Sequence, residues 1–232
     1  MHVSRESTSL RQLVEDRLRN AISTGVFAPG QRLVERELCE MTGVGRTSIR
    51  EALRQLEAEG LVTTIPHRGP SVSVITADEA EQLYAMRALL EGYAGRECAR
   101  RRDGAVIARL RQHFQRLVAH SGEPGHSGLL AAKTDFYDAL LEGCGNVFVQ
   151  RSLNVLLNRV TVLRMTSMTR SNRISQSLTE IEAILTAIEA GDEASAERAC
   201  VQHIRNAADI ALAALRQDEA NAESEDTSRR RS

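Results

Sequence analysis

Three arginines stand four residues apart in this 232-residue sequence, at Arg46, Arg50 and Arg54. On a helix, residues four apart lie one above another, so the three guanidinium groups would form a single stripe. Arginine is well suited to guanine edges and to phosphates, and this spacing therefore predicts a helix that enters the major groove of DNA. A solvated charged helix face would carry the same stripe, so the neighbouring elements must separate the two interpretations.

The residues around this stripe have the order of a winged helix-turn-helix. Apolar residues recur at helical spacing in three segments, residues 8–24, 35–42 and 46–59. The apolar period then changes to two, and Pro66–Pro70 reverses the chain between two short strands. Arg68 and Gly69 lie at the tip of this hairpin, where Arg68 would reach a minor groove or a phosphate. We therefore predict a DNA-binding domain of three helices and a short β-hairpin over residues 7–75.

The rest of the chain predicts an antiparallel bundle of six helices, which makes the fold class mainly α. Breaks rich in glycine and polar residues separate six amphipathic segments, at residues 78–101, 104–120, 127–143, 147–170, 173–190 and 193–216. The first segment has an apolar face made of Leu83, Met86, Leu89, Leu90, Tyr93 and Ala94. We assign residues 78–216 to this second, all-helical domain. Residues 219–232 are polar and lack periodicity, which predicts a disordered tail.

Composition limits the function classes. The net charge is −1, so a DNA-binding function must depend on where particular arginines lie and not on bulk charge. No run approaches the roughly 18 apolar residues of a membrane helix, and the N-terminus lacks the apolar stretch of a signal peptide, which predicts a cytoplasmic protein with no membrane contact. The four cysteines are far apart, which argues against a zinc knuckle and against a disulfide framework.

The motifs of the first domain resemble the GntR superfamily of bacterial transcription factors. The matching segments are Gly25–Leu33, Gly43–Leu53, Glu59–Val62 and Arg68-Gly69. The resemblance implies that Arg36, Arg46, Thr47 and Arg50 contact operator bases or phosphates, and that the wing around Gly69 approaches the minor groove. Gly45 departs from the family, which has Ser or Thr there. Glycine is an acceptable helix N-cap but supplies no hydroxyl, which predicts a small loss of affinity.

The second domain resembles the FCD ligand-binding domain of the FadR-type branch, in its shorter six-helix, VanR-type version. The resemblance implies that residues 78–216 bind an effector and form the dimer. The matching segments are Met86–Glu91, Phe136–Leu140, Gly145-Asn146, Ile184–Ile188, Gly191-Asp192 and Ala199–Ile204. Many such domains bind a divalent metal through one Asp and three His. Here those four positions match Lys133, Tyr137, Ile181 and His203, so three of the four ligands are replaced. One imidazole beside an ammonium cannot hold a divalent ion, and we predict no metal site and no cofactor.

Lys133 suggests another way to bind an effector. If the helix register is right, Lys133, Tyr137 and His203 point into the bundle, and Arg87 and Arg164 could face the same space. A buried cation must pair with an acid or await an anion, so we hypothesise a pocket for a small carboxylate with Lys133 as its cationic anchor. The alternatives are an internal salt bridge, for which Arg87 and Glu91 are suitably spaced, and extension of the Lys133 ammonium to water. Both remain open from the sequence.

The function that these features favour is a ligand-responsive transcription regulator, and a repressor more than an activator. A homodimer would present two winged domains to a pseudo-palindromic operator, because its two-fold symmetry is mirrored in the DNA. The first rival is an enzyme, but the sequence has no Gly-x-Ser-x-Gly, His-Glu-x-x-His or phosphate-loop motif. The second rival is a helical interaction module whose wing binds protein.

Overall fold

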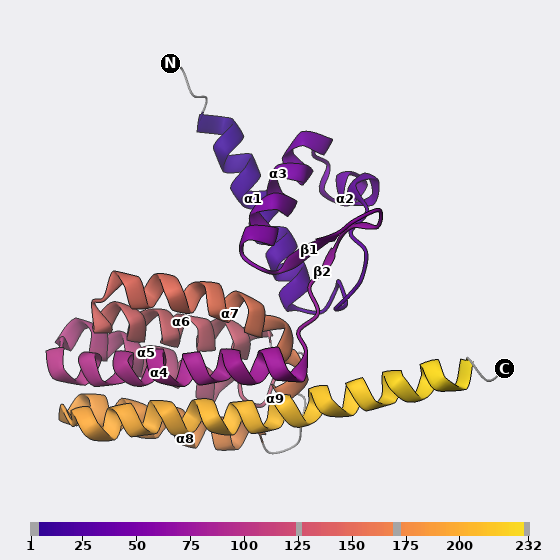
Figure 1. Cartoon of the computed structure of the whole chain (residues 1–232). Helices are drawn as coiled ribbons and strands as arrows, with labels where there is room; N and C mark the ends of the chain where they lie inside the picture. Colours follow the sequence, from indigo (N-terminus) through magenta and orange to yellow (C-terminus); the bar gives the residue numbers. More distant parts are fainter. Residues whose placement is uncertain (1–4, 124–126, 169–172, 230–232) are drawn as a thin grey trace. The chain divides into compact units, whose positions relative to one another are not determined.

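The structure, a computed structural model, describes residues 5–123, 127–168 and 173–229. Apart from residues 157–165, the chain divides between Ile75 and Thr76 into an N-terminal unit and a helical unit, and each is described by itself. The elements of the N-terminal unit are α1 (Arg5–Ser23), α2 (Glu35–Thr42), α3 (Arg46–Ala58), β1 (Val62–Ile65) and β2 (Gly69–Val72) (Figure 1). This order confirms the predicted winged helix-turn-helix.

The apolar face of α3 packs against α1 in the core of the N-terminal unit. Ile49, Ala52 and Leu56 are buried in one cluster with Leu18 and Ile22 of α1. Burial of each large aliphatic side chain contributes about 1.5–3 kcal/mol, which fixes the rotation of α3 about its axis. The residues between these positions are consequently directed outward.

Gly60 ends α3 and directs the chain into the first strand. It adopts a left-handed φ of 76°, which an L side chain rarely tolerates. Its N–H donates to Glu57 O (2.9 Å), and the next N–H, from Leu61, donates to Leu56 O (2.9 Å). These two bonds form a Schellman motif, which satisfies carbonyls at the helix end.

The two strands form the wing. They pair antiparallel with Ile65 opposite Gly69, so the turn is only three residues long. The Arg68 N–H donates to Ile65 O (3.0 Å), and His67 adopts a φ of 64° within the turn. The second strand begins at Gly69, earlier than the alternation of Val72 and Val74 predicts. The reason is that Pro70 needs no N–H here, while its carbonyl accepts a hydrogen bond from the Leu33 N–H (2.8 Å).

The helical unit contains the six predicted helices. They are α4 (Ala77–Arg101), α5 (Gly104–His120), α6 (Ser127–Cys144), α7 (Val147–Met168), α8 (Arg173–Ala190) and α9 (Glu193–Arg229). Thr76 and Glu79 form a capping box at the start of α4, each side chain accepting the other's backbone N–H at 3.2 Å. A core of buried side chains lies among these helices, including Leu110, Phe136 and Ile184. Within the described residues, none of the helices is long and apolar enough to cross a membrane.

Helices α4 and α9 run side by side along the helical unit (Figure 1). Gly95 of α4 allows this close approach, because a Cβ there would lie 2.5 Å from the sulfur of Cys200 and 3.1 Å from the carbonyl oxygen of Ala196. Cys98 of α4 and Cys200 of α9 are both buried in the core of the helical unit, and burial raises the pKa of each thiol. These cysteines are therefore packing residues and poor nucleophiles.

The predicted apolar face of α4 is divided between two sides of the helix. Leu83 and Ala94 are buried, whereas Met86 is 48% exposed and Leu89 is 69% exposed. The inward side instead includes a polar residue, Arg87, at 2% exposure. Apolar residues thus lie on two faces of α4, and the residues that the structure describes cover only one of these faces.

The C-terminal segment differs from its prediction. Residues 219–232 were expected to be disordered, but α9 continues as helix to Arg229. Residues 219–229 are rich in Ala and Glu, which have high helix propensity even without an apolar face. The Glu219 carboxylate also accepts a hydrogen bond from the Ala77 N–H at the start of α4 (2.9 Å).

Candidate functional site

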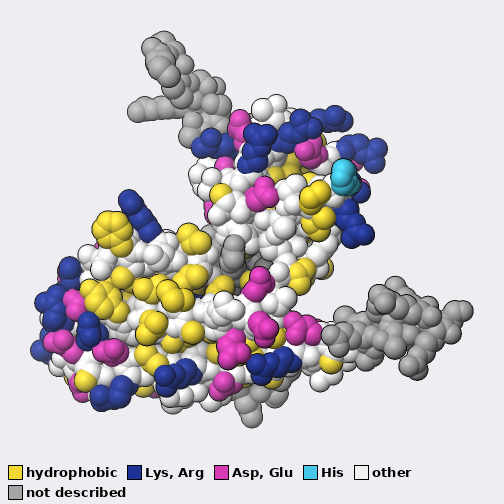
Figure 2. All heavy atoms as spheres, viewed as in Figure 1, with side chains coloured by type: hydrophobic (Ala, Val, Ile, Leu, Met, Phe, Trp, Pro, Cys, Tyr) yellow, Lys and Arg dark blue, Asp and Glu magenta, His cyan; other side chains and the backbone are white. Residues whose placement is uncertain are grey.

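The arginine stripe of α3 faces outward. Arg46, Arg50 and Arg54 are all exposed, on the side of the helix opposite its buried residues. Figure 2 shows dark-blue side chains gathered along one edge of the N-terminal unit. Arg46 and Arg54 make no ion pair with any residue that the structure describes. Their donors are consequently available to an external partner.

Arg50 is exposed but already held in place. Its Nε lies 2.8 and 2.9 Å from the two carboxylate oxygens of Glu35, the first residue of α2. This contact bridges the two helices of the helix-turn-helix and raises the pKa of Arg50, chiefly through the hydrogen bond to Glu35. The guanidinium is thereby ordered before any partner binds.

The remaining predicted DNA contacts are also on the surface. Arg36 and Thr47 are exposed, and Arg36 lies only loosely near Glu40 at 3.9 Å. Gly45 is the N-cap of α3 in an extended conformation, with no side chain to accept a hydrogen bond and open space where a Cβ would lie. On the wing, Arg68 is exposed and Gly69 adopts a φ of 81°.

In the helical unit, Arg87 forms the internal salt bridge with Glu91 that the sequence offered as an alternative to binding an effector. Its Nε donates to Glu91 Oε1 at 2.8 Å, and both side chains are almost completely buried. The Arg87 guanidinium also lies 5.2 Å from the centre of the Tyr84 ring. This cation is therefore neutralised within the chain and is a poor candidate for binding an effector anion.

The other predicted effector residues meet a group of polar side chains from α6, α8 and α9. Lys133 Nζ donates to Ser177 Oγ at 3.2 Å, and the ring of Tyr137 lies 6.4 Å from that of His203, centre to centre. Tyr137 and His203 are both buried. Arg164 belongs to the part of α7 whose side chains are outside the described residues, so its position is not tested.

His203 is joined to Glu180, which the sequence did not single out. The two side chains meet at 2.5 Å between His203 Nδ1 and Glu180 Oε2. Asn206 Nδ2 and Arg173 Nη1 both donate to the other oxygen of Glu180, at 2.6 and 2.9 Å. We call these four residues, Arg173, Glu180, His203 and Asn206, the Glu180 cluster.

The Glu180 cluster has a defined ionisation state near neutral pH. Burial opposes the charge on Glu180, but hydrogen bonds from His203, Arg173 and Asn206 outweigh it and lower the pKa of Glu180 to about 2. Burial lowers the pKa of His203 to about 3, with Lys133 and Arg173 acting in the same direction. At neutral pH, Glu180 is therefore an anion and His203 is a neutral imidazole that donates from Nδ1.

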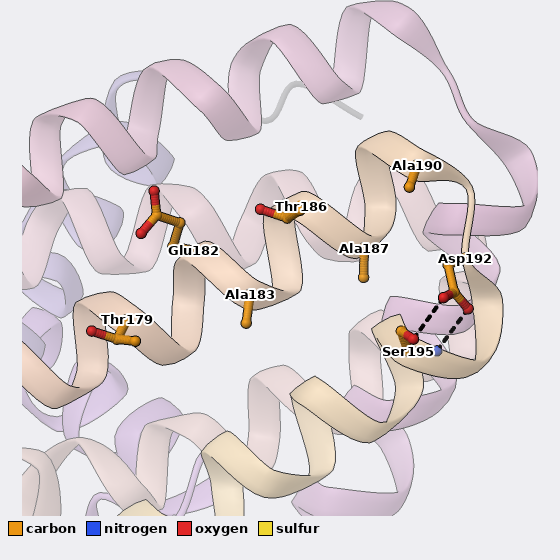
Figure 3. Close-up of a pocket in the computed structure, with 8 residues that line it drawn as sticks. All are labelled: Thr179, Glu182, Ala183, Thr186, Ala187, Ala190, Asp192 and Ser195. Carbon is orange, nitrogen blue, oxygen red and sulfur yellow. Dashed lines mark hydrogen bonds between the residues drawn. The ribbon is translucent and has the colours of Figure 1, made fainter.

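An open groove of about 540 Å³ lies elsewhere, along α8 and the start of α9 (Figure 3). Small side chains such as Ala183 and Thr186 line it, together with the carboxylates of Glu182 and Asp192. The Asp192 carboxylate accepts hydrogen bonds from the backbone and the hydroxyl of Ser195, as the dashed lines show. With acidic but no basic side chains in its lining, this groove does not suit an anionic effector.

Comparison with known proteins shows two families in the chain. Residues 82–206 match the FCD domain, and residues 10–72 match the bacterial regulatory proteins of the gntR family. The chain belongs to the GntR family. It is a DNA-binding transcriptional regulator with an FCD domain, and it is not an enzyme.

Among its relatives, the HTH-type transcriptional regulator BphR of Paraburkholderia xenovorans is 32% identical over 170 residues, covering 69% of each chain. The "Probable D-xylose utilization operon transcriptional repressor" of Paenarthrobacter nicotinovorans is 28% identical, over 85% of this chain and 86% of its own. The fold is similar to a crystal structure of a GntR regulator from Rhodococcus sp. RHA1, with a TM-score of 0.77, 24% identity, and 89% and 99% of the two chains covered.

The residues of this GntR regulator do not fit the divalent metal of other FCD domains. The side chain at the first ligand position, Lys133, is a cation bonded to a hydroxyl, and Ile181 is an apolar core residue. His203 directs Nδ1 to one oxygen of Glu180, whose other oxygen accepts hydrogen bonds from Asn206 and Arg173. Among the described residues, no group of three His, Cys, Asp or Glu side chains is placed to hold a metal. The absence of a metal from the working protein stays a prediction.

Sequence reasoning missed the acids and polar groups that the cations meet. Glu35 lies in another helix from Arg50, and Glu180 lies 23 residues before its partner His203. One signal was present, since Arg173, Ser177 and Glu180 recur at helical spacing along α8. Two of the three, Arg173 and Ser177, are buried, and Glu180 is largely buried.

Proposed function

We propose that this protein is a homodimeric repressor in the bacterial cytoplasm that binds a pseudo-palindromic operator and responds to a small carboxylate. The observation that carries the DNA-binding part is the outward arginine stripe of α3 in the helix-turn-helix. A relative of this chain, 28% identical to it, is named as an operon repressor, which favours repression over activation.

We assign the residues of the N-terminal unit to two roles at the operator. Arg46 and Arg50, near the start of α3, read base edges in the major groove, and Thr47 and Arg36 contact phosphates beside them. Arg54 lies farther along the same stripe and contacts the backbone. At the wing, Arg68 and Gly69 approach the minor groove.

Replacing Arg50 or Arg46 with alanine is expected to weaken operator binding by about 1–3 kcal/mol each, because each change removes a base-reading guanidinium. The measurement is a gel-shift titration with duplexes that carry the operator or a scrambled sequence. Arg100→Ala provides the control, since Arg100 is an exposed arginine of α4 paired with Glu97.

The same titration at several salt concentrations tests the class of function. For a DNA-binding protein, the logarithm of the affinity falls linearly with the logarithm of the salt concentration, with a slope of about −0.9 for each phosphate neutralised. Binding that depends on neither salt nor sequence would instead support the interaction module, and wild-type affinity of both arginine variants would contradict the base-reading role.

The proposed homodimer is supported by apolar side chains that remain on the surface of the helical unit. On α4 these are Met86 and Leu89, and on α7 they are Phe148 and Val155, which are 73% and 50% exposed. Figure 2 shows hydrophobic side chains gathered on the face of the unit that contains these helices. Monomeric proteins rarely expose such a contiguous apolar area, and a second copy of the chain would cover it in a self-complementary way.

The carboxylate effector is supported by Lys133, a half-buried residue one helical turn before Tyr137, whose ammonium donates to Ser177. Lys133→Ala is expected to weaken binding of the cognate acid about tenfold, because an ion pair in a partly dry site is worth on the order of 1.4 kcal/mol. Calorimetry with a panel of organic acids measures this loss. Lys133→Arg keeps the charge and provides the control, and unchanged affinity of the alanine variant would contradict the anchoring role.

A further inference from the structure

Arg173 contains a buried donor that lacks an acceptor. It is the first residue of α8 and is 5% exposed, and its Nη1 donates to Glu180 at 2.9 Å. Its Nη2 is also buried, but finds no hydrogen-bond partner among the residues that the structure describes. A buried donor of a charged group is costly to leave unsatisfied, so it indicates an acceptor that the described residues do not supply.

Glu180 cannot supply this acceptor without breaking other contacts. Both of its oxygens already accept hydrogen bonds, one from His203 and one from Asn206 and Arg173. Rotation of the carboxylate toward Nη2 would therefore break hydrogen bonds to buried donors. The arrangement fixes a negative charge on one side of the guanidinium and leaves a directed donor on the other.

The surroundings of Arg173 add positive charge. Ser177 lies one turn after Arg173 on α8, and its hydroxyl accepts the hydrogen bond from Lys133 Nζ. Both Lys133 and Arg173 act electrostatically on His203, so the two cations approach one imidazole from α6 and α8. An acceptor that also carries a negative charge would interact favourably with both.

We propose that Arg173 Nη2 binds the carboxylate of the effector, and that the fixed charge of Glu180 restricts the effector to compact monoanions. This inference rests on the proposed effector function. It adds the side chain that recognises the effector, Arg173, and the net charge that the effector carries. A dianion would place a second negative charge close to Glu180 in a partly dry environment, where charges repel strongly. A neutral amide would satisfy the donor but gain nothing from the cations.

The wild-type protein gives the first test, through benzoate, benzamide of nearly the same shape, and phthalate, which adds a second carboxylate. Benzoate carries one charge, phthalate carries two, and benzamide carries none. Calorimetry is expected to show benzoate binding, with phthalate and benzamide each weaker by roughly tenfold or more. Equal affinity for phthalate would overturn the exclusion by Glu180, and equal affinity for benzamide would overturn anion recognition. Failure of benzoate to bind at millimolar concentration would overturn both.

A variant gives the second test. Glu180→Gln keeps the shape and the acceptor oxygen but removes the charge, so the preference for benzoate over phthalate is expected to fall by roughly tenfold. Glu182→Gln is the matched control, because Glu182 is an exposed carboxylate two residues farther along α8. Arg173→Met is expected to remove benzoate binding. If a variant does not fold, as circular dichroism would show, the wild-type comparison still decides the proposal.

The operator titration separates this inference from the proposed function. A protein that binds its operator in a salt-dependent way but does not distinguish benzoate from phthalate would retain the regulatory function and lose the role of Glu180. A protein that binds no operator sequence, yet distinguishes the probes, would retain the anion site and lose the proposed function.

Discussion

Replacement of both Leu89 and Phe148 by glutamate is expected to convert the proposed dimer to a monomer and to weaken operator binding by about a hundredfold. The two side chains are 69% and 73% exposed, the highest values among the large apolar residues described. Four glutamates would meet in a self-complementary interface, where like charges without partners cost several kcal/mol. A monomer binds only one half-site and loses the advantage of a linked second contact.

Analytical ultracentrifugation measures the change in mass, and fluorescence anisotropy with full and half operators measures the change in affinity. Val118→Glu is the control, since Val118 is 48% exposed on α5, outside the helices of the proposed interface. A double variant that remains dimeric would exclude this face of α4 and α7 as the interface.

Replacement of Glu91 by glutamine is expected to lower the free energy of unfolding by about 3–5 kcal/mol, because Arg87 would remain charged and buried without its counter-ion. Both side chains are no more than 3% exposed. Urea unfolding followed by circular dichroism gives the measurement. For comparison, Arg100→Ala removes an exposed pair and should cost only about 0–1 kcal/mol.

The double variant Arg87→Met and Glu91→Leu distinguishes the loss of a counter-ion from the loss of packing. Because it replaces the pair with apolar side chains of similar volume, its stability is expected to lie near or above that of the wild type. A single variant as stable as the wild type, or a double variant as unstable as the single one, would contradict this account of the pair.

Periodicity predicted the helices well because their breaks are local. The start of α3 at Arg46 follows from Gly45, and its end follows from the glycine at position 60. Periodicity did not predict which apolar residues of α4 are buried. In the sequence, an apolar stripe that packs into the core has the same spacing as one that stays on the surface. Met86 and Leu89 therefore seemed to be core residues, and only the packing of α9 and α6 against α4 shows that they are not.

The sequence predicted single residues of the candidate sites, but mostly not the residues with which they form hydrogen bonds and ion pairs. The cations Arg50, Arg87 and Lys133 were recognised from their positions, whereas their partners depend on how separate helices align. Glu91 could be predicted because it lies one turn from Arg87 on the same helix. Glu35 comes from a different helix from its arginine, and no local rule would have identified it.

The contact between Arg50 and Glu35 has a consequence for how the regulator finds its site in a genome. A carboxylate beside the guanidinium weakens its attraction to any phosphate but leaves its outer donors free to read a base edge. A genome offers on the order of 10⁶–10⁹ non-specific sites that compete with the operator for a DNA-binding protein. Weaker binding to these non-specific sites leaves more copies of the protein free for the operator. Residues 1–77 hold ten arginines and nine acidic residues, so the N-terminal unit has little excess positive charge to hold it at random sequences.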